Sequence, residues 1–253
     1  MTVVPVLLYH AVTEHPPAAV GHFAVHPSRF AEHVGCLRES GRVGLTVSEF
    51  AACLKGRSQL PELPVLVTFD DGYADFLDAA ERLADAGFPS TLYVTTGQVD
   101  TAGMLTRAQL RSLGGTVEVG AHSREHRRLD ELPPDRLRDE VCGSKADLED
   151  LLQRPVRSFA YPHGDHDQGV RQVVVEAGFG SAAAVKNALS HDRDDPFAIA
   201  RITVTAGTST RRIGELLDGR GAPRAWSQER RRTRAYRAYR RLRRRLHGKA
   251  GTA

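Results

Sequence analysis

The chain has 253 residues, of which 41% are hydrophobic and 26% charged. These values are typical of globular proteins and exclude the collagen-like, disulfide-scaffold and wholly disordered classes. The net charge of +4 hides an asymmetry, because ten Arg, one Lys and one Glu between Glu229 and Lys249 give a local balance of +10 and leave −6 for the first 228 residues. The basic character therefore belongs to a C-terminal tail, which argues against a basic body made for nucleic acid.

Cysteine usage and apolar run lengths bear on the compartment. The three cysteines, Cys36, Cys53 and Cys142, are odd in number and lack CxxC spacing. That pattern favours a reducing compartment over a disulfide framework or a thiolate metal site. The longest apolar run, residues 3–9, is far shorter than the ~20 residues of a membrane helix, and no Lys/Arg-led signal segment precedes it. We therefore expect a soluble, cytoplasmic protein.

Seven short apolar runs, rich in β-branched or aromatic residues, predict strands. In chain order they cover residues 3–9, 63–69, 90–96, 116–121, 156–161, 180–185 and 198–204. Amphipathic stretches bounded by Pro or Gly predict helices between them, over residues 27–40, 73–86 and 132–152. This alternation indicates an α/β fold with a parallel sheet buried on both faces, either open and doubly wound or closed. Seven strands within residues 1–218 favour a closed barrel in a single domain.

Chemistry in such folds gathers where strands end. The segment TFDDGY, residues 68–73, places Asp70 and Asp71 directly after a buried strand, and Gly72 permits a sharp turn. Two adjacent carboxylates cannot both stay unpaired at low dielectric, so one of them is expected to face a cation. The alternative is that one Asp only caps the helix that follows.

A pair of histidines follows the fourth predicted strand. His122 and His126 are four residues apart, and on a helical turn they would face the same side and could bind one divalent ion. With one carboxylate they form a two-His, one-Asp set that leaves positions open for water and substrate. An accidental pair is the alternative, since the chain has eleven His. The position just after a strand, in a chain with DDG after another, favours the metal site.

Two further strand ends carry polar groups. The segment FAYPHG, residues 159–164, is either a simple Pro–Gly turn or the wall of a pocket made by Tyr161 and exposed main chain. His10 ends the first strand, where a lone His is often only hydrogen-bonded. Its place on the same rim as the carboxylates makes it a candidate proton donor.

Together these motifs resemble the polysaccharide deacetylase family, the NodB-homology domain of carbohydrate esterase family 4, over residues 3–218. The matching segments are TFDDG at 68–72, HSREH at 122–126, FAYPHG at 159–164, AGF at 177–179 and PFAIARITV at 196–204. The resemblance implies a distorted (β/α)7-type barrel, a divalent metal that is usually zinc, and hydrolysis of an N-acetyl group from an amino sugar. That sugar would sit in a glycan or in a lipid- or nucleotide-linked intermediate.

Carried over by position, the resemblance implies roles for individual residues. Asp70 would be the general base, and Asp71, His122 and His126 the metal ligands. The backbone N–H of Tyr73 would hold the oxyanion. The remaining residues implied at the substrate are Tyr161 and Pro162. His163 and His166 flank the pocket by sequence and either touch sugar hydroxyls or are exposed loop histidines, and we favour the latter interpretation.

The chain departs from the commoner family pattern in two places. Phe159 replaces the Arg that often opens the third motif, and a late Leu-x-His element is missing. Both features resemble the subgroup that includes the biofilm poly-N-acetylglucosamine deacetylases, in which a Tyr-His near the N-terminus contributes the acid. That makes His10 the expected acid here, and Arg201 is our candidate for orienting Asp70.

Two other functions stay open at this point. The same fold could act as an amidohydrolase on a non-sugar C–N bond, or the chain could be a non-catalytic carbohydrate-binding relative. The intact carboxylate and histidine set argues against the latter, because a binding module need not keep a base beside a metal ligand.

The chain divides into a catalytic domain, residues 1–222, and an Arg-rich tail, residues 223–253, that is helical or disordered. A narrow apolar stripe recurs at helical spacing within the tail, at Tyr236, Tyr239, Leu242 and Leu246. Three uses fit, in falling order of preference: a solvated tail, peripheral contact of residues 229–249 with anionic lipid at the inner face of the membrane, and contact with nucleic acid.

Overall fold

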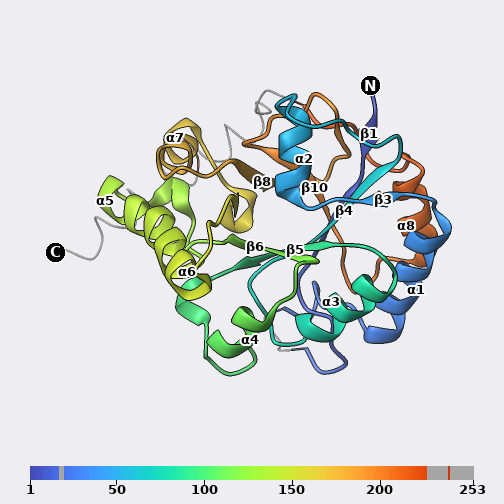
Figure 1. Ribbon diagram of the computed structural model, residues 1–253, viewed down its shortest axis with the longest axis horizontal. Coiled ribbons are helices and arrows are strands. Elements are labelled where there is room, and N and C mark those ends of the chain that lie inside the picture. Colours follow the sequence, from blue (N-terminus) through green and yellow to red (C-terminus); the bar gives the residue numbers. More distant parts are fainter. Residues whose placement is uncertain (17–19, 227–238, 240–253) are drawn as a thin grey trace.

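The strands of the computed structural model close into a ring around a buried interior, with helices around it (Figure 1). The structure describes residues 1–16, 20–226 and Tyr239. Seven parallel strands form the ring in the order β2-β10-β8-β7-β6-β5-β4, and a further pairing of β2 with β4 closes it. The predicted barrel is therefore confirmed, and the open doubly wound alternative is wrong.

Each strand of the ring falls within one of the seven predicted runs. The ring strands are β2 (Val6–Tyr9), β4 (Pro64–Phe69), β5 (Ser90–Val94), β6 (Val117–Ala121), β7 (Ser158–Ala160), β8 (Ser181–Val185) and β10 (Ile199–Thr203). Three short strands lie outside the ring, β1 (Val3–Val4) and β9 (Ser190–His191) as an antiparallel pair and β3 (Val43–Gly44) against the start of β4.

Helices surround the strands (Figure 1). The α-helices are α1 (Pro27–Glu39), α2 (Val47–Leu54), α3 (Phe76–Asp85), α4 (Arg107–Ser112), α5 (Pro134–Arg138), α6 (Ser144–Leu152), α7 (Gln168–Glu176) and α8 (Thr210–Leu217). Short helical turns are η1 (Thr96–Gln98), η2 (Leu129–Glu131), the π-helix η3 (Asp139–Gly143) and η4 (Pro162–Gly164). Within the described residues, none of the helices has the length and apolar composition that crossing a bilayer requires.

The helix expected over residues 132–152 is present from Pro134 to Leu152, but its middle turn is widened. This stretch is α5, then the π-helix η3, then α6, because one widened turn interrupts the regular helical repeat. Helix α2 was missed, although Thr46 and Glu49 form a capping box at its start, a signal that the sequence does contain.

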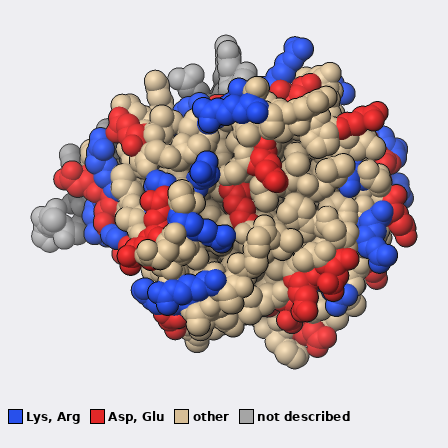
Figure 2. Space-filling view, in the orientation of Figure 1, with Lys and Arg blue, Asp and Glu red and all other residues tan. Residues whose placement is uncertain are grey.

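The side chains of the ring divide between two buried clusters. One set points outward and packs under the surrounding helices. The other lies inside the ring and includes Val6, Leu66, Tyr93 and Ile199, with Phe50 of α2 packed against it. Because strand side chains alternate, Arg201, two residues after Ile199, also points into the barrel. On the face shown in Figure 2, acidic and basic side chains intermingle without a large field of one sign.

Candidate active site

The carboxyl ends of three ring strands meet at one pocket. β2 and β4 pair in register, with Tyr9 opposite Phe69, so the residues that follow them, His10 and Asp70, emerge as neighbours. His122 follows β6. The pocket has a volume of about 360 Å³. Its lining residues among those described are Leu8, His10, Val20, Phe23, Asp70, Asp71, His122, His126, His163, Val185 and Thr203.

The chain turns sharply after β4 at the DDG motif. Asp71 and Gly72 have φ angles of 77° and 92°, a region that Gly adopts freely and Asp more readily than most residues. Helix α3 begins only at Phe76, and its N-cap residue is Asp75. The N-cap interpretation of Asp70 and Asp71 is therefore wrong, and both carboxylates line the pocket.

Asp70 is paired with Arg201 inside the barrel. The guanidinium donates two hydrogen bonds to the carboxylate, at 2.6 Å to Oδ1 and 2.9 Å to Oδ2, and neither residue is more than 3% exposed. Burial by itself would raise the pKa of Asp70, but Arg201, with smaller effects from His122 and His10, lowers it to about 2. Asp70 is therefore ionised at neutral pH. The contact expected between Arg201 and Asp70 is present.

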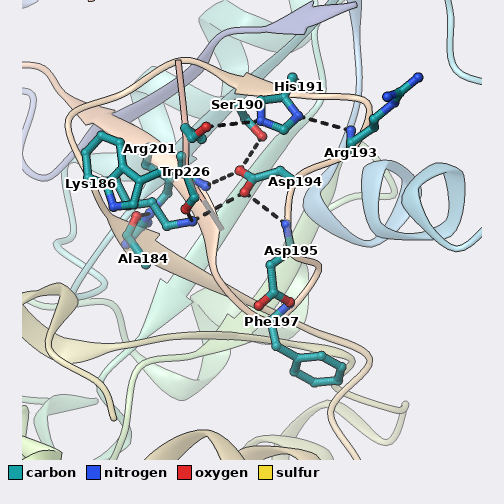
Figure 3. A network of polar contacts seen from close by, with 12 residues as sticks. Ala184, Lys186, Ser190, His191, Arg193, Asp194, Asp195, Phe197, Arg201 and Trp226 are labelled. Atoms are coloured by element: carbon teal, nitrogen blue, oxygen red, sulfur yellow. Dashed lines mark hydrogen bonds and ion pairs between the residues drawn. The ribbon is translucent and has the colours of Figure 1, made fainter. Parts of the chain in front are cut away.

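A second polar network holds the strand that carries Arg201 (Figure 3). The carboxylate of Asp194 accepts hydrogen bonds from the Ala200 backbone N–H at 2.9 Å and from the Ser190 hydroxyl at 2.8 Å. Lys186 lies 3.3 Å from the same carboxylate. Because Ala200 directly precedes Arg201, this network fixes the start of β10 and with it the position of the guanidinium.

Asp71, His122 and His126 gather on the side of the pocket next to Asp70. One donor atom from each lies within 4.8 Å of the others. Oδ1 of Asp71 is 3.6 Å from Nε2 of His122 and 3.4 Å from Nε2 of His126. The backbone carbonyl of Ala160 lies 2.8 Å from Nδ1 of His122 and accepts its proton, which leaves the Nε2 lone pair directed at the cluster.

These three residues fit a divalent metal ion. Nitrogen and oxygen ligands in tetrahedral arrangement at ~2.1 Å from zinc lie about 3.4 Å apart, close to the two separations measured here. Oδ1 of Asp71 is buried without a hydrogen-bond partner among the described residues. Burial raises the pKa of Asp71 to about 6 and lowers the pKa of His122 to about 3, and it lowers the pKa of His126 as well. Both imidazoles are therefore neutral at pH 7, as metal ligation requires.

The expectation that His122 and His126 share a helical turn is wrong. Residues 122–126 form a loop in which Ser123 and His126 have φ angles of 62° and 57°. The backbone N–H of His126 donates to the Ser123 hydroxyl at 3.0 Å and closes the loop. The two imidazoles nevertheless converge, with ring centres 4.8 Å apart. A spacing of four residues is met by this tight loop as well as by a helix.

His10 lines the same pocket and packs against an aromatic side chain. Its ring packs on Phe23 with centres 5.0 Å apart, and its Nδ1 is buried without a hydrogen-bond partner among the described residues. Phe23 comes from the loop between β2 and α1, and its backbone N–H donates to the Val20 carbonyl at 2.8 Å. Phe23 and Val20 were not predicted from sequence, since nothing in that loop marks them as pocket residues.

The third motif contributes a different residue from those expected. Tyr161 and Pro162 are buried, and the Tyr161 hydroxyl donates to the carbonyl of Phe197 at 2.9 Å. His163 lines the pocket instead, with φ of 58°, and its ring centre lies 4.5 Å from that of His126. Its place directly before Gly164 in a Pro–Gly turn is the signal that could have pointed to an outward-turned side chain.

Tyr73 lies at the entry to the loop after the DDG turn. The residues on either side of Tyr73 form backbone hydrogen bonds with residues 103–105. The N–H of Leu105 donates to the carbonyl of Gly72, and the N–H of Ala74 donates to the carbonyl of Gly103. Burial of the phenol raises the pKa of Tyr73 above its usual range, and the charge of Asp71 and its hydrogen bond with the Tyr73 hydroxyl add to this effect. The membrane and nucleic-acid contacts expected of residues 229–249 fall, apart from Tyr239, outside the described residues.

Comparison with known proteins connects this geometry to a family. A family model described as polysaccharide deacetylase matches residues 57–182, the stretch that contains the DDG, HSREH and FAYPHG motifs. The chain belongs to the polysaccharide deacetylase family. The resemblance noted from the motifs is thus confirmed, and membership supports hydrolytic deacetylation as the reaction class.

Relatives of this polysaccharide deacetylase resemble it in sequence or in fold. YxkH of Bacillus subtilis (strain 168) is 23% identical over 216 residues, which span 85% of this chain and 76% of YxkH. IcaB from Ammonifex degensii is 25% identical with a TM-score of 0.75, and 86% of this chain and 97% of IcaB are covered. The Streptococcus pyogenes deacetylase PplD, solved in complex with acetate, is 22% identical with a TM-score of 0.76, over 83% of this chain and 96% of PplD.

Proposed function

We propose that this chain is a metal-dependent N-deacetylase of an amino sugar. The observation that carries the proposal is the ionised Asp70, held by Arg201, beside the set of Asp71, His122 and His126. Oδ2 of Asp70 lies 3.7 Å from Nε2 of His122, so the carboxylate faces the same space as the three ligands without belonging to them.

Asp71, His122 and His126 would hold the metal, for which zinc suits two imidazoles and one carboxylate with positions left open. A bound divalent ion supplies Lewis acidity toward a carbonyl oxygen and makes water more acidic. Asp70 would accept a proton from the attacking water. Arg201 keeps Asp70 ionised but also makes it a weak base, so a proton that it takes up is passed on readily.

His10 would handle the leaving amine. His10 emerges beside Asp70 from the adjacent strand, and it would donate the proton that lets the C–N bond break. The backbone N–H of Tyr73 would stabilise the oxyanion, because it leaves the DDG turn next to Asp71. Acetate and a free amino sugar are the expected products.

The substrate class follows from the family and from the pocket wall. Leu8, Phe23 and Val185 give one side of the pocket an apolar surface, which suits an acetyl methyl group and the face of a sugar ring. Tyr161 and Pro162 would support the substrate only indirectly, because both are buried next to His163 in the chain and neither lines the pocket. We propose an N-acetylated amino sugar, in a glycan or in a linked biosynthetic intermediate.

An acetate-release assay on zinc-loaded protein tests this proposal. The substrates are chitooligosaccharides, poly-N-acetylglucosamine fragments and nucleotide- or lipid-linked N-acetylamino sugars, and metal content is measured on the same samples. We expect Asp70→Asn to retain the metal and lose turnover, whereas His122→Ala loses both. Turnover by Asp70→Asn at the wild-type rate would contradict the assigned base. Wild-type protein that binds zinc and sugar but releases no acetate would be a binding module.

A further inference from the structure

The loop that carries His126 needs support from outside itself. Ser123 and His126 both have positive φ, at 62° and 57°, a conformation that residues with a Cβ adopt only when their surroundings impose it. The loop's own closing bond, from the His126 N–H to the Ser123 hydroxyl, uses one of its N–H groups. The N–H groups of the two residues between them, Arg124 and Glu125, point elsewhere.

Those two N–H groups converge on a single buried carboxylate. Oε2 of Glu140 accepts the backbone N–H of Arg124 at 2.9 Å and that of Glu125 at 2.9 Å. Glu140 is only 1% exposed. Consecutive N–H groups that curve around an anion form a strong binding concavity, and hydrogen bonds to an ionised acceptor are stronger than neutral ones. Glu140 therefore holds the middle of the loop in the conformation that its ends require.

The helical segment behind the loop places Glu140 there. Glu140 lies in the π-helix η3, and widened turns of this kind are frequent at functional sites. The Arg124 side chain crosses the same segment, donating to Asp147 at 2.9 and 2.8 Å and to Asp139 at 2.5 Å. A Cβ at Gly143 would come within 2.4 Å of the Arg124 guanidinium carbon, so the small residue leaves room for this crossing.

The two histidines depend on this arrangement unequally. His122 directly follows β6, its backbone N–H donates to Val94 at 2.9 Å, and its ring is oriented by Ala160. These three constraints come from the barrel. His126 lies at the far end of the loop, beyond the residues that Glu140 holds. Loss of Glu140 should therefore displace His126 and leave His122 in place.

We propose that Glu140 is a positioning residue that holds His126 toward a divalent metal ion shared with Asp71 and His122. This inference rests on the proposed function, because it assumes that the three side chains bind a metal. It adds a residue outside the proposed ligand set, whose contact with the loop is made through the backbone N–H groups of Arg124 and Glu125.

Zinc affinity of the purified protein, measured by competition with a chromogenic chelator, tests the inference without an activity assay. We expect Glu140→Gln to weaken zinc binding about 10- to 100-fold, as for other residues that orient metal ligands. The loss should not exceed that of His126→Ala. In the His126→Ala background, Glu140→Gln should have no further effect on zinc affinity.

Amide hydrogen exchange supplies a second readout on the metal-free protein. The amides of Arg124 and Glu125 should exchange faster in Glu140→Gln than in the wild type. Glu118→Gln is the matched control, because Glu118 also accepts a backbone N–H, from Ser48 at 3.0 Å, but lies near the opposite end of β6. This control should leave both amides and the zinc affinity unchanged.

The outcomes separate this inference from the proposed function. Wild-type protein without zinc affinity overturns both. Wild-type protein that binds zinc, together with a Glu140→Gln variant that binds it equally well and keeps both amides protected, overturns the inference alone. If Glu140→Gln does not fold, Glu140→Asp keeps the charge on a shorter side chain and is expected to show an intermediate zinc affinity. Failure of both variants to fold would make Glu140 a residue of the general fold and would also overturn the inference.

Discussion

Replacing Arg201 by Met tests the buried ion pair on which the ionisation of Asp70 depends. Removing one partner of a buried, hydrogen-bonded ion pair costs about 3–5 kcal/mol of folding free energy, because the other charge stays buried without compensation. The pKa of Asp70 supports this size. Its folded value of about 2, against roughly 3.9 in an unfolded chain, corresponds to about 3 kcal/mol of stability at pH 7.

The effect should depend on pH with a definite sign. In the wild type the folded pKa of Asp70 is depressed, so its contribution is present above the unfolded pKa and is lost as the pH falls toward 2. In Arg201→Met, burial without the guanidinium raises the folded pKa of Asp70 above the unfolded value. The variant's penalty is then present at pH 7 and relieved at lower pH. The stability difference between wild type and variant should therefore shrink on acidification.

Urea unfolding of the metal-free proteins at pH 7 and pH 4.5 measures this difference. Arg171→Met is the matched control, since Arg171 makes the same two-point contact with Asp195, at 2.6 and 3.0 Å, but its side chain is 35% exposed. We expect a loss of about 0–1 kcal/mol for that exposed pair. An Arg201→Met loss no larger than that of Arg171→Met, or one that stays constant between the two pH values, would refute the reasoning.

Three further predictions follow from the site, the core and the tail. Zinc affinity should fall about tenfold per pH unit below pH 6, because the metal then displaces the proton of Asp71, whose pKa is about 6. Isothermal titration between pH 5 and pH 7.5 measures this dependence, and a zinc affinity that does not change with pH would contradict the ligand assignment. Phe69→Ala should lose about 3–5 kcal/mol in urea unfolding, because its fully buried ring packs on Tyr9, Phe30 and Phe76; a loss under about 1 kcal/mol would mean that the core closes over the gap. Sedimentation with anionic liposomes should decrease on removal of residues 229–253 if the tail contacts lipid, and equal sedimentation would end that hypothesis.

The ring of strands could be predicted because each strand is marked by the apolar residues of its own short segment. Each strand is short and buried on both faces, so its apolar run contrasts with the amphipathic helices on either side. The rim residues followed from the same signal, since His10, Asp70 and His122 each come directly after such a run.

What could not be predicted depends on contacts between distant segments. The π-helix around Glu140 belongs to a stretch whose sequence is compatible with a continuous helix, and only its packing against the loop of residues 122–126 distinguishes the two. The spacing of His122 and His126 was equally ambiguous, because it does not report the left-handed backbone at Ser123 and His126. Phe23 approaches His10 through a loop without a distinctive pattern.

The position of β2 in the ring has a consequence for synthesis. This strand is made before both of its partners, β4 and β10, and Arg201 follows Asp70 by 131 residues. During translation, the backbone N–H and C=O groups on one edge of β2 stay unpaired until β10 is synthesised. Unpaired strand edges can form hydrogen bonds with other chains and lead to aggregation. Nascent deacetylase is therefore expected to be a client of chaperones that shield exposed strands during translation.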